Sequence, residues 1–123
     1  MIPVGLPVAD IGTDHGRLPA WLLRNGRVPR VIATDRAAGP LQGAQQRLRG
    51  LSVDLRLGDG LHTLDSGEVE TVVLAGMGGR RVVRILQSCP EITASLTCVV
   101  VQPQGEAEWL RRYFIDWKWR LFE

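Results

Sequence analysis

The chain has 123 residues, which suits one domain and leaves no room for a second. Hydrophobic residues make up 45% and charged residues 23%, a balance that supports a buried core. The apolar runs are only about five to seven residues long, far below the roughly 20 residues of a bilayer span, so we expect no membrane helix.

The N-terminal residues lack a basic region followed by a long apolar stretch, so we expect no signal peptide. The two cysteines, Cys89 and Cys98, have neither metal-site nor disulfide-framework spacing. This pattern predicts a reduced, cytoplasmic protein.

Five short runs rich in β-branched residues predict strands at residues 7–10, 31–35, 53–57, 71–75 and 98–102. The second, fourth and fifth runs are almost wholly apolar, which is typical of strands covered on both faces of a parallel sheet. The segments between and after them predict helices at residues 18–25, 40–49, 80–87 and 106–117.

The last of these helices carries an apolar stripe formed by Leu110, Tyr113 and Phe114, and the same spacing includes Trp109 and Trp117. We therefore expect both tryptophans to lie in the core, although in principle they are able to stack on bases.

Strand and helix alternate along the whole chain, which predicts an α/β fold with a doubly wound, mostly parallel sheet of the Rossmann-like type. We expect a single domain over residues 1–123, without a linker or an internal repeat. Residues 119–123 resemble the start of a sixth strand, so the predicted sheet is incomplete at its C-terminal end.

The loop after the first predicted strand combines glycine with acidic side chains. Gly12 and Gly16 permit tight turns and a close approach of the backbone to a ligand. Asp10 and Asp14 make the loop acidic, which disfavours a pyrophosphate and favours a cationic ligand. The next residue, His15, is either a participant in the chemistry or a hydrogen-bonded loop residue.

Acidic residues also follow the second and third predicted strands. Asp35 is placed to accept hydrogen bonds from ribose hydroxyls, and Asp59, beside Gly60, to accept one from an adenine amino group. Each aspartate alone is more typical of a turn or a helix cap than of a ligand site, but their repetition at successive strand ends favours a nucleoside site.

After the fourth strand, Gly76, Met77 and Gly78 leave the backbone bare at the expected mouth of the site. Arg80 and Arg81 then begin a helix, where they either contact phosphate or form a solvated turn. Gln102, at the end of the fifth strand, is a candidate for contact with the edge of a base.

Together these residues resemble the bacterial tRNA (adenine-N1)-methyltransferase family that modifies adenine 22 of the D-arm. The resemblance rests on D-I-G-T-D-H at 10–15, Leu18-Pro19, Gly39-Pro40 with Gln42 and Ala44, G-D-G-L at 58–61, A-G-M-G-G at 75–79, and Gln102-Pro103. Family members extend further at both ends, so the resemblance implies a truncated member, and this chain has Gln104 where the family has asparagine.

The resemblance implies a class I methyltransferase fold, S-adenosyl-L-methionine as cofactor and tRNA as partner. As a mechanism, we expect Asp14 and His15 near the methyl-transfer region and Gln102 in contact with the target base; in-line attack by adenine N1 requires alignment and no strong general base. The implied cofactor-binding residues are Asp10, Gly12, Asp14, Gly16, Asp35, Asp59 and Gly60, and we add Gly76, Met77 and Gly78 from the glycine-rich loop after the fourth strand.

Two other functions compete with this hypothesis. One is a catalytically inactive fragment that binds cofactor or RNA, in which the exposed edge of the sheet leads to a homo-oligomer. The other is a nicotinamide-dependent oxidoreductase, against which the acidic first loop and the absence of G-x-G-x-x-G argue. We expect no metal site, because no spaced cluster of His, Cys or carboxylate residues is present.

Overall fold

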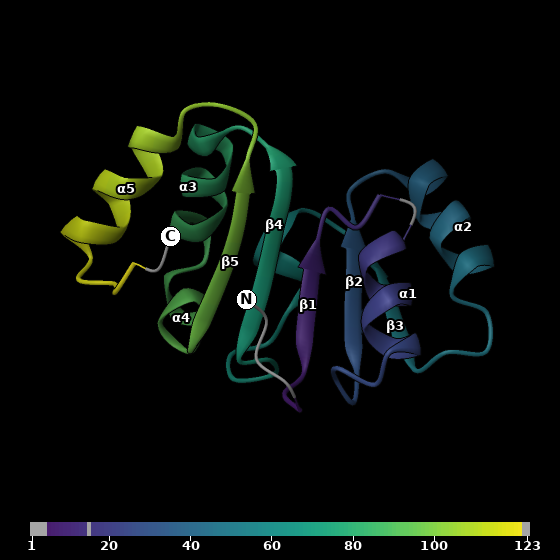
Figure 1. The fold of residues 1–123 in the computed structure, drawn as a ribbon. Coiled ribbons are helices and arrows are strands. Elements are labelled where there is room, and N and C mark those ends of the chain that lie inside the picture. The colour runs from purple at the N-terminus through teal and green to yellow at the C-terminus, as the bar shows by residue number, and fades with distance from the viewer. Residues whose placement is uncertain (1–4, 15, 122–123) are drawn as a thin grey trace.

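A five-stranded parallel sheet forms the centre of the computed structural model, which describes residues 5–14 and 16–121 (Figure 1). The strands are β1 (Val8–Ile11), β2 (Val31–Asp35), β3 (Val53–Leu57), β4 (Thr71–Met77) and β5 (Cys98–Pro103). Their order across the sheet is β3-β2-β1-β4-β5, and every neighbouring pair is parallel. The doubly wound α/β class that the alternating pattern predicts is therefore confirmed.

Helices cover both faces of this sheet (Figure 1). They are α1 (Arg17–Arg24), α2 (Ala38–Arg47), the 3₁₀ helix η1 (Gly60–Thr63), α3 (Gly79–Ser88), α4 (Pro90–Ala94) and α5 (Ala107–Asp116). None of the helices in the described parts of the chain is long and apolar enough to cross a membrane.

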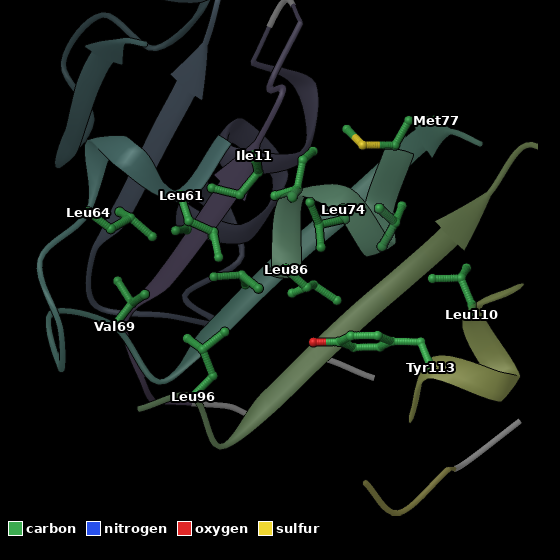
Figure 2. Packing of buried hydrophobic residues seen from close by; sticks show 14 of the residues in the cluster. Ile11, Leu61, Leu64, Val69, Leu74, Met77, Leu86, Leu96, Leu110 and Tyr113 are labelled. Atoms are coloured by element: carbon green, nitrogen blue, oxygen red, sulfur yellow. The ribbon is translucent and has the colours of Figure 1, made fainter. Parts of the chain in front are cut away.

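Two apolar layers hold the helices to the sheet, because side chains of a strand point alternately to its two faces. Ile11 and Leu74 face the layer that contains Leu86 of α3 and Tyr113 of α5 (Figure 2). On the opposite face, Val8, Val31 and Val73 pack against Leu22 of α1. Because both faces of β1 and β4 are buried, the carboxyl ends of these strands are held in fixed positions.

The two tryptophans of α5 correct the sequence prediction. Trp109 is 48% exposed and Trp117 is 65% exposed, whereas Leu110, Tyr113 and Phe114 are buried. Trp109 is one position before the buried Leu110, so it falls at the margin of the narrow stripe that a ten-residue helix buries. Trp117 shares the spacing of the stripe, but it is the C-cap residue and lies beyond the end of α5.

The observed elements agree with the predicted ones to within two residues, and the structure adds η1 and α4, which the sequence pattern did not predict. The expected sixth strand is not formed over residues 119–121, and residues 122–123 lie outside the described part of the chain. Instead, Trp119 folds back against Phe114, with the ring centroids 5.9 Å apart.

Candidate functional site

The strand order reverses between β1 and β4, since the chain runs outward from β1 through β2 to β3 and then returns to β4 on the other side. Ligands of open parallel sheets bind at the carboxyl ends of the strands beside such a reversal. The structure has a cavity of about 380 Å³ at this place. Among the predicted site residues, it is lined by Gly12, Asp14, Asp35, Asp59, Gly60, Gly76 and Met77.

The loop after β1 is tied to the end of β2. The Asp14 backbone N–H donates to Asp35 Oδ2 at 3.1 Å, and the Ala37 N–H donates to Asp35 Oδ1 at 3.0 Å. Gly12 and Asp14 both have a positive φ, 72° and 58°, which turns the loop sharply over the sheet. The Asp35 carboxylate therefore stabilises the turn and also lines the cavity, and the two hydrogen bonds fix its orientation.

Asp10 lies outside this cavity. It is 5% exposed and points to the same face of β1 as Val8, whereas Ile11 points to the other face and lines the cavity. Burial raises the pKa of the Asp10 carboxyl to about 7, opposed by the nearby Thr13 hydroxyl and reinforced by the charge of Asp35. The Asp10 carboxyl thus lies beside Thr13 of the first loop and does not face the cavity.

The turn at Gly58, Asp59 and Gly60 forms another part of the cavity lining. Asp59 precedes η1 but its side chain makes no capping hydrogen bond, so the helix-cap interpretation does not account for it. Gly60 has a φ of 54°, and an added Cβ would lie 3.3 Å from Ile85 Cγ2.

A side chain of β3 anchors the segment after this turn. Arg56 donates to the Thr63 carbonyl at 2.7 Å and to both carboxylate oxygens of Glu68, at 2.7 and 2.6 Å. The hydrogen bond from Arg56 lowers the pKa of Glu68 to about 2. This charged pair holds η1, and with it the Asp59 turn, against the edge of the sheet.

The glycine-rich end of β4 serves two purposes. Gly76 lies at a β-bulge between Ala75 and Met77, has a φ of 74° and lines the cavity. Gly78 lies outside the cavity, where an added Cβ would meet Glu106 Oε1 at 2.7 Å. Gly78 therefore lies beside the Glu106 side chain, in the segment before α5.

Three further predicted site residues lie outside the cavity or outside the described residues. Gly16 packs against α2, where an added Cβ would lie 2.9 Å from Leu48 Cδ1, and it does not line the cavity. Gln102 is exposed on β5, also away from the cavity lining, while Gln104 lines it and donates its N–H to the Met77 carbonyl at 2.8 Å. His15 lies outside the described residues.

The electrostatics of the cavity combine acids and bases. Asp14, Asp35 and Asp59 face it together with Arg36 and Arg81, so the carboxylates outnumber the guanidinium groups. In the described ranges 5–14 and 16–121, no three His, Cys, Asp or Glu side chains come together in a group that would hold a metal ion. The cavity suits a ligand with a cationic group and polar hydroxyls.

The profile of the methyltransferase domain matches residues 1–123. The chain belongs to this family. This membership favours the methyltransferase hypothesis over the nicotinamide-dependent oxidoreductase.

Known proteins similar to this methyltransferase domain include the tRNA (adenine(22)-N(1))-methyltransferase of Bacillus subtilis strain 168, 30% identical over 126 residues. The match covers 99% of this chain and 53% of that protein, so the domain spans about half the length of this curated relative. The crystal structure of the B. subtilis enzyme TrmK, an M1A22 tRNA methyltransferase, superposes with a TM-score of 0.90 at 31% identity, covering 99% of this chain and 54% of the other.

A Streptococcus pneumoniae protein solved in complex with S-adenosyl-L-methionine is similar as well, with a TM-score of 0.88 at 31% identity. That match covers 93% of this chain and 56% of the other. The fold of the domain is therefore the Rossmann-like methyltransferase fold.

The structure also brings residues to the cavity of the methyltransferase domain that sequence reasoning did not select. Thr34 is 1% exposed and lines the cavity, and its Oγ1 has no hydrogen-bond partner among the described residues. Arg36 and Pro40 follow it on the same wall. Their positions in the sequence could have indicated them, because Thr34 and Arg36 flank the selected Asp35 at the end of β2.

Proposed function

We propose that this chain is the cofactor-binding part of a tRNA (adenine-N1)-methyltransferase that uses S-adenosyl-L-methionine. The observation that carries the proposal is the convergence of Asp14, Asp35 and Asp59, from three separate strand ends, on one cavity at the reversal of strand order. The relatives named above, which include a tRNA methyltransferase and a protein with this cofactor bound, give the proposal its chemistry.

The residues of the cavity fit such a cofactor. Asp35 ends β2, where a carboxylate accepts hydrogen bonds from ribose hydroxyls, and the unpartnered Thr34 hydroxyl lies beside it. Asp59 is free of a capping role and is available to an adenine amino group. Gly12 and Gly76, both at positive φ, leave the backbone open to close approach between these acids.

When bound, S-adenosyl-L-methionine supplies an electrophilic methyl group next to a positive charge. Asp14 offers the negative field that a cationic ligand requires, and it faces the cavity from a loop that Asp35 holds in place. Gln104 and Met77 stand at the side of the cavity formed by the ends of β4 and β5. The residues of the cavity would align the cofactor methyl group with the lone pair of adenine N1, and this chemistry would need no strong general base.

The partners and the location follow from this activity. A tRNA substrate implies that the protein works in the cytoplasm, where Cys89 and Cys98, both free thiols in the structure, stay reduced.

We also propose that β5, whose outer edge pairs with no strand among residues 5–14 and 16–121, mediates pairing of two copies of the chain.

Calorimetric titration with S-adenosyl-L-methionine and S-adenosylhomocysteine tests the proposal. We expect micromolar binding of both ligands by the wild-type chain. The variant Asp59→Ala should bind about tenfold more weakly, because it loses a charge-assisted hydrogen bond without losing a cap. Asp116→Ala removes the same charge at the end of α5, away from the cavity, and should bind as wild type does.

A second measurement addresses the reaction. Unmodified tRNA incubated with the chain and the cofactor should yield N1-methyladenosine, detected by mass spectrometry of the digested RNA. A folded chain that binds neither ligand would refute the proposal. Cofactor binding without methylation would favour the inactive cofactor-binding fragment.

A further inference from the structure

Trp109 is an exposed aromatic side chain held in a defined position. It lies in the first turn of α5 and is 48% exposed, next to the buried Leu110. The Arg80 guanidinium lies over its ring, with Cζ 4.5 Å from the ring centroid. This cation–π contact orients the indole without burying it.

Arg80 is in turn fixed by Glu106. Arg80 Nε lies 3.0 Å from Glu106 Oε2, and the Arg80 backbone N–H donates to Glu106 Oε1 at 3.4 Å. Glu106 itself has a φ of 59°, and Gly79 donates its N–H to the neighbouring Gly105 carbonyl at 3.1 Å. The first turns of α3 and α5 therefore hold the Glu106, Arg80 and Trp109 side chains as one arrangement, which we name the Arg80–Trp109 stack.

The Arg80–Trp109 stack lies at the rim of the cavity. Arg80 is the chain neighbour of Arg81, and Glu106 comes two residues after Gln104; both Arg81 and Gln104 line the cavity. An added Cβ on Gly78, which ends the loop beside Met77, would meet Glu106 Oε1. The first turn of α3 thus contributes to the cavity through Arg81 and to the stack through Arg80.

We propose that the Arg80–Trp109 stack binds an unpaired base of the RNA substrate. A base stacks on the part of the indole that Arg80 leaves exposed, and Arg80 adds positive charge beside the RNA backbone. Base–aromatic stacking accepts any base and is a main source of affinity for unpaired nucleic acid. This inference rests on the proposed function, because it assigns the RNA of that reaction to a specific surface.

The test is binding of a fluorescein-labelled single-stranded oligoadenylate, measured by fluorescence anisotropy on the full 123-residue chain. Trp109→Ala should weaken binding about tenfold, and Trp109→Phe, which keeps an aromatic face, should stay within about threefold of wild type. The matched control is Trp117→Ala, which removes the other exposed tryptophan of the α5 region, 65% exposed, and should leave the affinity unchanged.

Equal affinity of wild type and Trp109→Ala would overturn the stack as an RNA site, and so would equal losses in Trp109→Ala and Trp117→Ala. A wild-type chain that does not bind the oligoadenylate would overturn it as well. Titration of the wild-type chain with S-adenosyl-L-methionine reports separately on the proposed function. Cofactor binding with no effect at Trp109 would reject the stack and leave the cofactor proposal standing.

Discussion

At the scale of single residues, the carboxyl of Asp10 is buried next to Thr13, in the loop that faces the cavity. Burial and the neighbouring charge of Asp35 raise the pKa of this carboxyl to about 7. In the unfolded chain the same carboxyl titrates near its ordinary value of 3.8. The folded state therefore takes up a proton between these two values.

This difference makes the stability contribution of Asp10 depend on pH. The folded state binds this proton more tightly than the unfolded chain does. The resulting stabilisation is fully present below the pKa of the unfolded chain, 3.8, and it is lost as the pH rises toward the folded-state pKa of about 7. The free energy of unfolding of wild type, relative to that of Asp10→Asn, should fall by roughly 1.4 kcal/mol per pH unit within this window. Urea unfolding of both proteins between pH 4.5 and 8 measures this difference in the free energy of unfolding. The other titratable groups are the same in both proteins, so their contributions cancel in the difference. A difference between the two proteins that stays constant with pH would contradict the raised pKa.

At the scale of elements, the close contact between the first turns of α3 and α5 shapes the rim of the site. An added Cβ on Gly79 would overlap the Glu106 carbonyl oxygen, so a glycine is required where the two helices begin. The glycine-rich end of β4, which sequence reasoning assigned to ligand access, thus divides into Gly76 at the cavity and Gly78 and Gly79 at a helix contact.

Replacement of Gly79 tests this contact. Gly79→Ala should destabilise the protein by about 1–3 kcal/mol, because the two helix ends must separate to admit a methyl group. The control is Gly39→Ala in α2, where an added Cβ meets nothing within 4 Å, and alanine should stabilise the helix by about 0.5–1 kcal/mol. Thermal and urea unfolding measure the stability of each variant relative to wild type. An unchanged stability of Gly79→Ala would show that the helix ends are not in close contact.

At the scale of the whole molecule, β5 presents an unpaired apolar edge among the described residues. Val99, Val100 and Val101 are only partly buried, and a groove of about 770 Å³ runs along this strand beside Leu110 and Phe114 of α5. Edge strands of this kind pair readily with another strand. Two copies joined antiparallel at β5 would cover both edges by one symmetric contact.

We expect the wild-type chain to dimerise at micromolar concentration and Val100→Lys to remain monomeric, because a charge beside the edge opposes strand pairing. Light scattering after size-exclusion chromatography measures the mass, and cofactor titration checks that the variant is folded. A monomeric wild type, or a dimeric Val100→Lys, would argue against pairing at β5.

Much of the fold and part of the site could be predicted, because they depend on local patterns. The apolar runs that form β2 and β4 are covered on both faces, as a parallel sheet requires, whereas the similar run in β5 is only partly buried at the edge of the sheet. In such a sheet all carboxyl ends meet at one edge, so Asp35 and Asp59 come together even though 24 positions separate them in the chain.

The rest depended on distances between segments that no local pattern encodes. In the sequence, Asp10 and Asp14 were equally good candidates for the ligand site. Only the structure shows that Asp10, on the alternating pattern of β1, is buried and that Asp14 faces the cavity. Gln102 and Gln104 likewise differ by their positions relative to the end of β5.

The sequence by itself determined the class of fold, the order of its elements and the acidic character of the strand ends, because each follows from hydrophobic spacing and residue type. Only the tertiary structure decided which of these groups face the cavity, that Thr34 has an unpartnered hydroxyl there, and that Trp109 is exposed at its rim. The physical reason is that burial and hydrogen bonding depend on how the layers pack. A helical period specifies which side chains share a face, whereas the neighbouring helix determines how much of that face is covered.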